Sequence, residues 1–373
     1  MKILHVASHW AVIRGGAIQL SRMAEEQHSR GHDVTVVFPD QFLRNPVVRK
    51  RNIDSWKALG AKGVKIKKIG FRSIFGAARL GLFLKKNVFD IIHVHRNEAL
   101  IKTTKALELK QISTPVVVQR GTVTSPCKAH ILSAFKSPCV KAYTVVAGAV
   151  KDVLINALGK SREKMIHVVY GSVDIDKFFP RPVDKKILSQ VGFPEDAKII
   201  GSLSSYRKSK RLDFLLKVLS KIMVKHKKIY AVFLGANMHK EIIPMAKKLG
   251  IYEKCYFAGF QEDIRPWLSI MDLSVVTADD QEGLSGVLRE SLSMEIPAVS
   301  TSCAGNIEII QHEKTGLLVP VNDEKALENS ILWAVSHPKQ MQTMAKNGRK
   351  WVKLNCSVKI QVDKLDEIYA SLL

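Results

Sequence analysis

Short apolar runs and amphipathic stretches alternate along almost the whole chain. The runs "KILHVAS", "HDVTVVFP" and "FDIIHVH" are rich in β-branched and apolar residues, which is typical of buried strands. Between such runs lie stretches with helical spacing of apolar residues, for example "EALIKTTKALELK". Strands and helices that alternate in this way form parallel sheets with helices on both faces. The sequence therefore predicts an α/β fold of the doubly wound type.

The alternation is interrupted once, between residues 165 and 182. There "MIHVVYGSVDIDKFFPRP" begins as a strand and becomes a turn-rich segment with two prolines, after which "AKIIGSLSS" starts the pattern again. At 373 residues the chain is long enough for two ordinary domains. We expect two Rossmann-like domains, residues 1–175 and 182–356, that face each other across a cleft. Ligands bind such sheets at the carboxyl ends of the strands, so the site is expected there.

The composition argues against several other classes of protein. No uninterrupted apolar run reaches the about 18 residues of a membrane-spanning helix. The apolar run in "MKILHVASHW" is too short for a secretory leader. The five cysteines are odd in number and have no zinc-type spacing, which favours reduced thiols. We therefore expect a cytoplasmic protein.

Positive charge is concentrated in the first half of the chain. The formal net charge is +24, of which residues 1–180 contribute +18 and residues 181–373 contribute +6. The stretch 41–86 has 13 basic residues and one acid, and it overlaps the apolar and basic segment "GFRSIFGAARLGLFLKKN". This segment fits either an ordinary sheet-packing helix or contact with an anionic membrane. The charge favours an anionic acceptor and a peripheral position on the inner face of the cytoplasmic membrane.

The stretch "EGLSGVLRE", residues 282–290, follows the predicted strand "DLSVVTA". It begins a stripe of apolar residues whose helical spacing would pack on a sheet: Leu284, Val287, Leu288 and Leu292. A helix start beside Gly283 and Ser285 suits a phosphate group, because its N–H groups and dipole attract anions. Glu282 and Glu290 would repel phosphate and so suit hydroxyl groups on either side of it, as in a nucleotide sugar. A capping acid and an exposed surface acid explain the spacing equally well.

The stretch resembles the glutamate–seven-residues–glutamate motif of retaining GT-B glycosyltransferases of family 4. Further matching segments cover nearly the whole chain in the family's order: "KILHVAS…GGA", "FDIIHVH", "VVYGSVDIDKFFP", "IIGSLSSYRKSKRLDFLL", "CYFAGF", "SMEIPAVSTSCAGNIEII" and "KTGLLVPVND". The resemblance implies a GT-B fold with the acceptor site in the first domain and the nucleotide-sugar site in the second. It also implies that the last helix, within residues 357–373, packs back on the first domain.

The resemblance implies a role for each residue of the donor site. Lys210 matches the lysine that neutralises the leaving diphosphate, and Ser205 stands where the family usually has a second cation, so Arg207 is the substitute candidate. Glu282 would hold the sugar hydroxyls and Glu290 the ribose. The other donor-binding candidates are Gly15, Gly16, Phe260, Gly283, Leu284, Ser285 and Glu308. Each of them also fits an ordinary turn, helix cap or solvated side chain.

Polar candidates in the first domain concern the acceptor. His93 and His95 alternate with apolar residues on one predicted strand. His95, nearer the carboxyl end, is the catalytic candidate, and His93 is more simply a packed histidine. The family often has another histidine at the place of Gly121, so Arg120 beside it is a candidate for acceptor contact, as is Arg14. This departure argues for a different acceptor or sugar orientation, or for weakened activity.

These observations predict a retaining glycosyltransferase that moves a sugar from a nucleotide-diphosphate sugar to an anionic envelope-type acceptor, such as a lipopolysaccharide core or another glycolipid or polysaccharide. The pair Asp279–Asp280 is weak evidence for a metal. The resemblance implies metal-independent chemistry in which Lys210 and the helix start take the cation's part, so no cofactor or metal is expected. One alternative is a nucleotide-sugar isomerase on the same fold. The other, a basic nucleic-acid-binding protein, lacks base-reading motifs and stacking aromatics.

Overall fold

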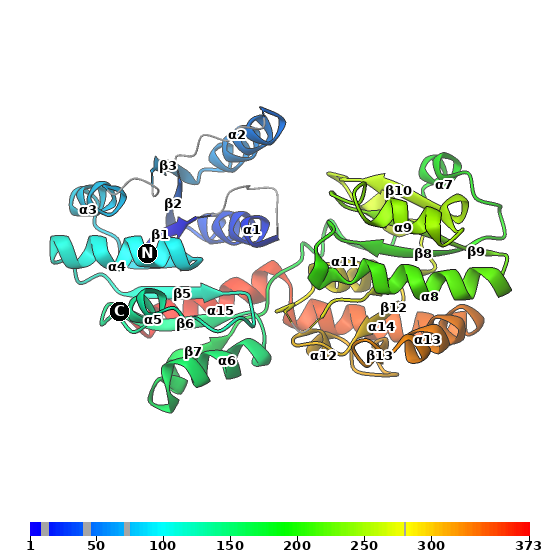
Figure 1. Ribbon diagram of the computed structural model, residues 1–373. Helices are drawn as coiled ribbons and strands as arrows, with labels where there is room; N and C mark the ends of the chain where they lie inside the picture. Colours follow the sequence, from blue (N-terminus) through cyan, green and yellow to red (C-terminus); the bar gives the residue numbers. More distant parts are fainter. Residues whose placement is uncertain (9–14, 40–45, 71–74, 280) are drawn as a thin grey trace. The chain divides into compact units, whose positions relative to one another are not determined.

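The computed structural model describes residues 1–373 except 9–14, 40–45, 71–74 and 280. The chain divides into two compact units, which are Met1–Ser172 with Val358–Leu373, and Val173–Ser357. Each unit contains one parallel sheet with helices packed on it (Figure 1). The predicted α/β class with two Rossmann-like domains is confirmed. Within the described part of the chain, no helix combines the length and the apolar character needed to cross a bilayer.

The first unit is built on a seven-stranded sheet in the order β3-β2-β1-β4-β5-β6-β7. Its described elements are β1 (Lys2–Ala7), α1 (Gly15–Ser29), β2 (Asp33–Pro39), α2 (Pro46–Ala61), β3 (Lys65–Ile69), α3 (Gly76–Lys86), β4 (Ile91–His95), α4 (Asn97–Lys110), β5 (Val116–Arg120), α5 (Ala129–Phe135), β6 (Val140–Val145), α6 (Gly148–Leu158), η1 (Lys160–Met165), β7 (Ile166–Val168) and α15 (Val358–Ala370). The direction of winding reverses between β1 and β4, where binding sites of doubly wound sheets lie.

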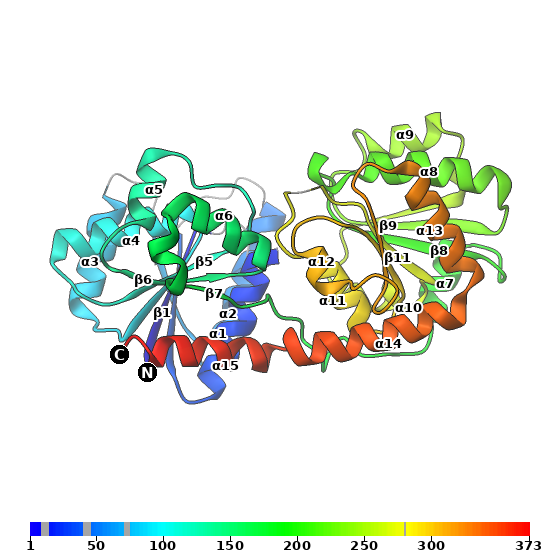
Figure 2. The ribbon, with the colours of Figure 1, turned by 90° about the horizontal axis from the view of Figure 1, so that it is seen from below.

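One face of this sheet is covered by helices from both ends of the chain. Met23 of α1 and Leu365 of α15 pack with Ile3 and Ile91, and all four side chains are buried. The helices α1 and α15 lie side by side (Figure 2). Arg30, just after α1, also donates to Asp363 (2.7 Å) and Asp366 (3.2 Å) of α15. The last helix is therefore part of the first unit's core.

The second unit contains a six-stranded sheet in the order β10-β9-β8-β11-β12-β13. Its described elements are α7 (Lys185–Val191), β8 (Lys198–Leu203), η2 (Lys208–Lys210), α8 (Leu212–Lys225), β9 (Ile229–Leu234), α9 (Ile242–Lys248), η3 (Tyr252–Lys254), β10 (Cys255–Gly259), α10 (Arg265–Ser269), β11 (Leu273–Val276), α11 (Gly286–Ser293), β12 (Ala298–Thr301), α12 (Asn306–Ile309), β13 (Leu317–Val319), α13 (Glu324–Ser336) and α14 (Pro338–Asn355). Here the winding reverses between β8 and β11.

The helix α11 is fixed to this sheet and to α14. Leu288 and Leu292 are fully buried, and the Ser291 hydroxyl donates to the Ser274 hydroxyl of β11 at 2.9 Å. Gly348 of α14 allows close packing, because a Cβ there would lie 2.7 Å from a Leu292 methyl group. These contacts hold the amino end of α11 beside the carboxyl ends of the strands.

Candidate functional site

The loops after β8 and β11 are joined into one wall. The Thr277 hydroxyl lies 3.1 Å from the carbonyl oxygen of Lys210, to which it can donate. The amide of Asp279 donates to the carbonyl of Ser209 at 2.9 Å. Because the loops follow the two strands at which the winding reverses, the wall lies where ligands bind in sheets of this type.

A glycine lets the turn after β9 join this wall. Gly235 has a φ of 139°, and a Cβ there would lie 2.1 Å from the carbonyl oxygen of Ser204, so a side chain does not fit. The hydroxyl of Ser205 accepts from the amide of Ala236 at 3.2 Å. Ser205, where the resemblance led us to look for a cation, therefore stabilises the turn instead.

The structure brings Lys210 and Glu282 together. Lys210 Nζ lies 2.5 Å from Glu282 Oε2, and the two side chains are only 14% and 19% exposed. The Lys210 amide donates to the carbonyl of Arg207 (2.8 Å), and the Glu282 amide donates to that of Asp279 (3.2 Å), so both residues are held by short local turns. In this partly buried place, the cation of Lys210 can bind an anionic group of a ligand, and the carboxylate of Glu282 can bind its hydroxyl groups.

The amino end of α11 follows Glu282 closely in the sequence. The hydroxyl of Ser285 caps the helix by accepting from the amide of Leu288 at 3.4 Å. Gly283 accepts from the amide of Gly305, and Leu284 is buried. The expected apolar stripe holds except at Val287, which lies in the first turn of α11 and is only half-buried.

The remaining candidates of the second unit are half-buried or exposed. Glu290 lies half-buried in α11, and Glu308 lies half-buried in α12. Phe260 is 38% exposed directly after the end of β10. Arg207 is exposed at the start of η2 and has no carboxylate partner among the described residues. Such side chains can contact a ligand without breaking the core.

Two glycines open the first unit's candidate site. Gly15 and Gly16 are the first two residues of α1 as described, and both are exposed. A Cβ at Gly15 would meet no atom within 4 Å, so the space beside it is open. Arg14 lies outside the described residues.

The two predicted histidines lie in a buried hydrogen-bond network that the sequence did not predict. His5 Nε2 is 2.7 Å from Gln27 Oε1, and His5 Nδ1 is 3.0 Å from His95 Nε2. Because the Gln27 oxygen can only accept, His5 donates from Nε2, and His95 must donate to the bare Nδ1 of His5. His95 is 3% exposed, so this nitrogen is turned away from solvent.

The same network continues through the last helix. Gln27 Nε2 donates to the Tyr369 hydroxyl (3.5 Å), which lies 2.6 Å from His93 Nδ1. His93 then donates from Nε2 to Thr144 at 3.3 Å. Burial lowers the pKa of His5 to about 4 and holds that of His93 well below its usual range, so both rings are neutral at pH 7. The donors of all these hydrogen bonds therefore point the same way along the network, and no histidine ring needs a second proton.

The cluster of three histidines and the pair Asp279–Asp280 are candidate metal ligands. Ligand atoms of His5, His93 and His95 lie within 4.8 Å of one another. Their fully buried rings already bond to one another and to neighbouring side chains, so they fit a hydrogen-bond network better than a metal centre. Asp279 accepts from the amide of Gln281 at 3.0 Å and thus stabilises its own turn, and Asp280 lies outside the described residues.

Arg120 ends β5 and is buried in the first unit. Its Nη1 lies 3.3 Å from Asn97 Oδ1, and its Nη2 donates to the carbonyl of Thr124. The guanidinium lies over the ring of Phe135 at 5.4 Å from its centroid. Burial lowers the pKa of Arg120, and no carboxylate compensates it among the described residues.

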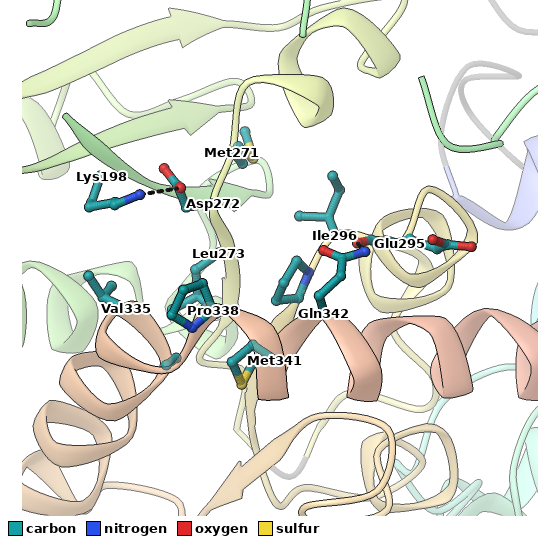
Figure 3. A pocket seen from close by; sticks show the side chains of 12 residues that line it. Lys198, Met271, Asp272, Leu273, Glu295, Ile296, Val335, Pro338, Met341 and Gln342 are labelled. Atoms are coloured by element: carbon teal, nitrogen blue, oxygen red, sulfur yellow. Dashed lines mark hydrogen bonds and ion pairs between the residues drawn. The ribbon is translucent and has the colours of Figure 1, made fainter. Parts of the chain in front are cut away.

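A pocket of about 210 Å³ lies at the opposite edge of the second sheet. Figure 3 shows the ion pair between Lys198 and Asp272 at its rim, near the start of β8 and β11, with Met341 of α14 below. These residues precede the strands, whereas Lys210 and Glu282 follow them. The pocket is therefore separate from the candidate site.

Two family models match the chain and meet near the linker. The model of glycosyltransferase family 4 matches residues 13–177, and the model of glycosyl transferases group 1 matches residues 183–351. The chain belongs to glycosyltransferase family 4. The structure of the HepE protein of Anabaena in complex with UDP and glucose has the same fold as this family-4 chain, with a TM-score of 0.85, 19% identity and full coverage of both chains.

Curated relatives of this family-4 glycosyltransferase chain are more similar in sequence. The N-acetyl-alpha-D-glucosaminyl L-malate synthase of Bacillus anthracis is 26% identical over 231 residues, which are 61% of this chain and 60% of the relative. The lipopolysaccharide core biosynthesis glycosyltransferase LpsE of Rhizobium meliloti is 26% identical over 162 residues, 42% of this chain and 45% of the relative. The alignments thus span about half the length of these two relatives.

Sequence reasoning missed several residues that shape this family-4 chain. His5, Gln27 and Tyr369 complete the histidine network but are separated by up to 364 residues. One signal was present, since His5 interrupts an apolar strand that pairs with the strand of His93. The ion pair of Lys210 with Glu282 was also not predicted, although both residues were candidates.

Proposed function

We propose that the protein is a retaining glycosyltransferase that transfers a sugar from a nucleotide-diphosphate sugar to an acceptor with an anionic group. The observation that carries the proposal is the contact of Lys210 with Glu282 beside the amino end of α11. A cation and free helix N–H groups suit a diphosphate, and a carboxylate suits sugar hydroxyls. UDP is the first nucleotide to test, because the similar Anabaena protein was studied with UDP.

Each group of this site has a task in the reaction. Negative charge grows on the leaving diphosphate as its bond to the sugar's anomeric carbon breaks, so Lys210 and the start of α11 stabilise the transition state more than the ground state. Glu282 holds sugar hydroxyls and favours the positive charge that develops at the anomeric carbon. Glu290 binds the ribose, while Arg207 adds a second, exposed cation and Phe260 borders the base.

The acceptor hydroxyl forms the new bond on the face from which the diphosphate leaves. Its proton passes to an oxygen of the leaving diphosphate, so no protein nucleophile is needed. Lys210 and the helix start supply the positive charge that a metal supplies elsewhere, and we therefore propose metal-independent chemistry. Gly15, beside which the space is open, and Gly16 are proposed to approach the diphosphate and the acceptor, and His95 remains the first unit's candidate for catalytic contact.

The acceptor is proposed to be an envelope-type glycan or glycolipid. Support comes from the relative named for lipopolysaccharide core biosynthesis and from the basic first half of this chain. The helix α3 packs through buried residues such as Leu80. Phe75 just before the helix (61%) and Leu82 within it (52%) are exposed, and so are Lys85 and Lys86. Apolar and basic side chains on one surface suit the anionic inner face of a membrane.

The test is a panel of nucleotide sugars and free nucleotides. The protein should be stabilised against heat by one nucleoside diphosphate and should slowly hydrolyse the matching sugar donor in the absence of acceptor. The anomeric configuration of the sugar as it is first released, or of the transferred product, read by NMR before mutarotation, should equal that of the donor. Inversion would refute the retaining mechanism, and conversion of the donor to another sugar nucleotide would indicate an isomerase.

A further inference from the structure

Arg120 presents a buried positive charge without a matching negative one. Its side chain belongs to a residue that is 6% exposed, and its Nε has no hydrogen-bond partner among the described residues. A guanidinium has five N–H groups, and only two of them find acceptors in the described part of the chain, at Asn97 and Thr124. Buried charges are normally paired, because desolvation of an unpaired ion is unfavourable.

The surroundings offer no full compensation for this charge. The ring of Phe135 attracts the guanidinium weakly through its π face. The amide oxygen of Asn97 and the carbonyl of Thr124 are neutral acceptors. Of the first unit's segments that the structure does not describe, 9–14 and 71–74 contain no acidic residue, and 40–45 contains Asp40, which follows β2, three strands away from β5 in the sheet order. An anion from outside the chain would complete the site.

The helix α4 begins at the same place. Arg120 follows Gln119, which pairs with His95 at the end of β4, and its Nη1 lies 3.3 Å from Asn97, the first residue of α4. This helix has 14 residues, and no side chain in the described residues caps its start at Arg96. The uncapped N–H groups and the dipole favour an anion at this end, where Glu98 in the first turn supplies one negative charge of the chain itself.

We propose that Arg120 and the amino end of α4 form a subsite for one oxyanion group of the acceptor, a phosphate or a carboxylate. The planar guanidinium can bind two oxygens of such a group at once, and the helix start can bind the third or a second anion oxygen. The residue after Arg120 is Gly121, which is exposed and carries no side chain to cover the subsite. This inference deepens the proposed function and rests on it, because the bound anion is part of an acceptor only if the protein is a transferase.

The test measures anion binding without any sugar donor. Inorganic phosphate and L-malate are titrated by calorimetry at constant ionic strength maintained with chloride, with glycerol as the neutral control. Wild-type protein should bind one of the two anions and not glycerol, which also tells a phosphate subsite from a carboxylate subsite. In Arg120→Gln the affinity should fall about tenfold or more, as expected for a lost charged hydrogen bond.

A matched control separates this subsite from general charge. Lys141→Gln removes the same charge from an exposed position near the start of β6, at the opposite end of the sheet, and should leave anion affinity unchanged. Should Arg120→Gln fail to fold, Arg120→Lys replaces it. A several-fold weaker affinity in Arg120→Lys supports the subsite, because lysine cannot bind two oxygens in a fork.

Two results would overturn the inference. One is wild-type protein that binds neither anion above the glycerol control, and the other is equal anion affinity in the wild type and the Arg120 variants. An anion that binds at Lys210 in the donor site would keep its affinity in the Arg120 variants, so the comparison of the variants separates the two sites. If anion binding follows Arg120 but no nucleotide sugar is hydrolysed, the subsite stands and the proposed transferase activity fails.

Discussion

Lys210 Nζ and Glu282 Oε2 are 2.5 Å apart, although 72 residues separate the two positions in the chain. A nucleoside diphosphate that approaches Lys210 therefore also approaches a carboxylate. In Glu282→Gln the repulsion is gone and Lys210 is unpaired, so we expect affinity for the free diphosphate to rise several-fold while turnover falls. Calorimetry with UDP and the other nucleoside diphosphates, together with initial rates, checks both. A large loss of nucleotide affinity in Glu282→Gln would contradict the assignment of this residue to the sugar end.

Removal of the cation should have a kinetic effect. Lys210→Ala is expected to lower kcat by roughly 10²–10³, on the scale of one lost preorganised donor to the developing charge. Arg207→Ala should lower it less, because Arg207 is exposed. EDTA should leave the rates of the wild type and both variants almost unchanged. Strong inhibition by EDTA that added Mg²⁺ or Mn²⁺ reverses would mean that a metal neutralises the diphosphate.

Glu290 is expected to act on the nucleotide itself. In Glu290→Ala the donor and the free nucleoside diphosphate should both bind about tenfold more weakly, as for loss of a charged hydrogen bond. Glu195→Ala, which removes an exposed carboxylate from the same unit, serves as the control and should bind as the wild type does. If Glu290→Ala changes turnover but not nucleotide affinity, the ribose assignment is wrong.

The buried histidines should make stability depend on pH. The pKa of His5 is about 4 in the folded protein, below its ordinary value of 6.5, so the unfolded chain binds the proton more tightly. Stability is then fully present above about pH 6.5 and is lost as pH falls toward 4, by up to about 1.4 kcal/mol per pH unit for each such histidine. Urea unfolding at several pH values measures this, and His5→Gln should show a smaller loss of stability over the same interval.

The hydroxyl of Tyr369 should stabilise the same network. Tyr369→Phe leaves His93 Nδ1 without its donor in a buried place, which is expected to lower the free energy of unfolding by about 1–3 kcal/mol. Tyr252→Phe changes a partly exposed ring and should have little effect. Equal stability of Tyr369→Phe and the wild type, measured by urea unfolding at pH 7, would mean that the hydrogen bond contributes nothing net.

Binding to anionic vesicles should depend on α3. The triple variant Leu82→Ser, Lys85→Ser, Lys86→Ser is expected to lose co-sedimentation with acidic lipid at low salt. Binding of the wild type should weaken at 1 M salt, where the Debye length is about 3 Å. Lys62 and Lys65 already form ion pairs with Glu25 and Asp33, so their replacement by serine is the matched control with a smaller effect. Wild-type protein that ignores acidic vesicles at low salt would remove the membrane from the proposal.

The fold class was predictable because most strands are apolar on both faces and are therefore visible in the sequence as short runs of apolar residues. The exception is β3, whose sequence "KIKKI" has three lysines. At the edge of a sheet, lysines protect the exposed side of a strand from pairing with other chains. An edge strand such as β3 therefore has few apolar residues by which the sequence could predict it. The preceding helix α2 was missed for a related reason, since its basic residues hide the apolar spacing.

The candidate site was predictable only in part. Glu282 and Lys210 are recognisable from local motifs, but their contact depends on which two strands are neighbours in the sheet. The unpaired charge of Arg120 is likewise a property of its burial and not of its sequence neighbours. The histidine network is formed by segments that are far apart in the chain, so no local sequence pattern predicts it.

The helix α15 makes the first unit discontinuous in sequence. Residues 173–357 are contiguous, whereas the first sheet needs Val358–Ala370 to cover Ile3 and Ile91 and to bring Tyr369 to His93. The unit that is synthesised first is therefore the one completed last. Until then the apolar face of the first sheet that contains Ile3 and Ile91 lacks its cover, and exposed apolar surface of this kind favours aggregation.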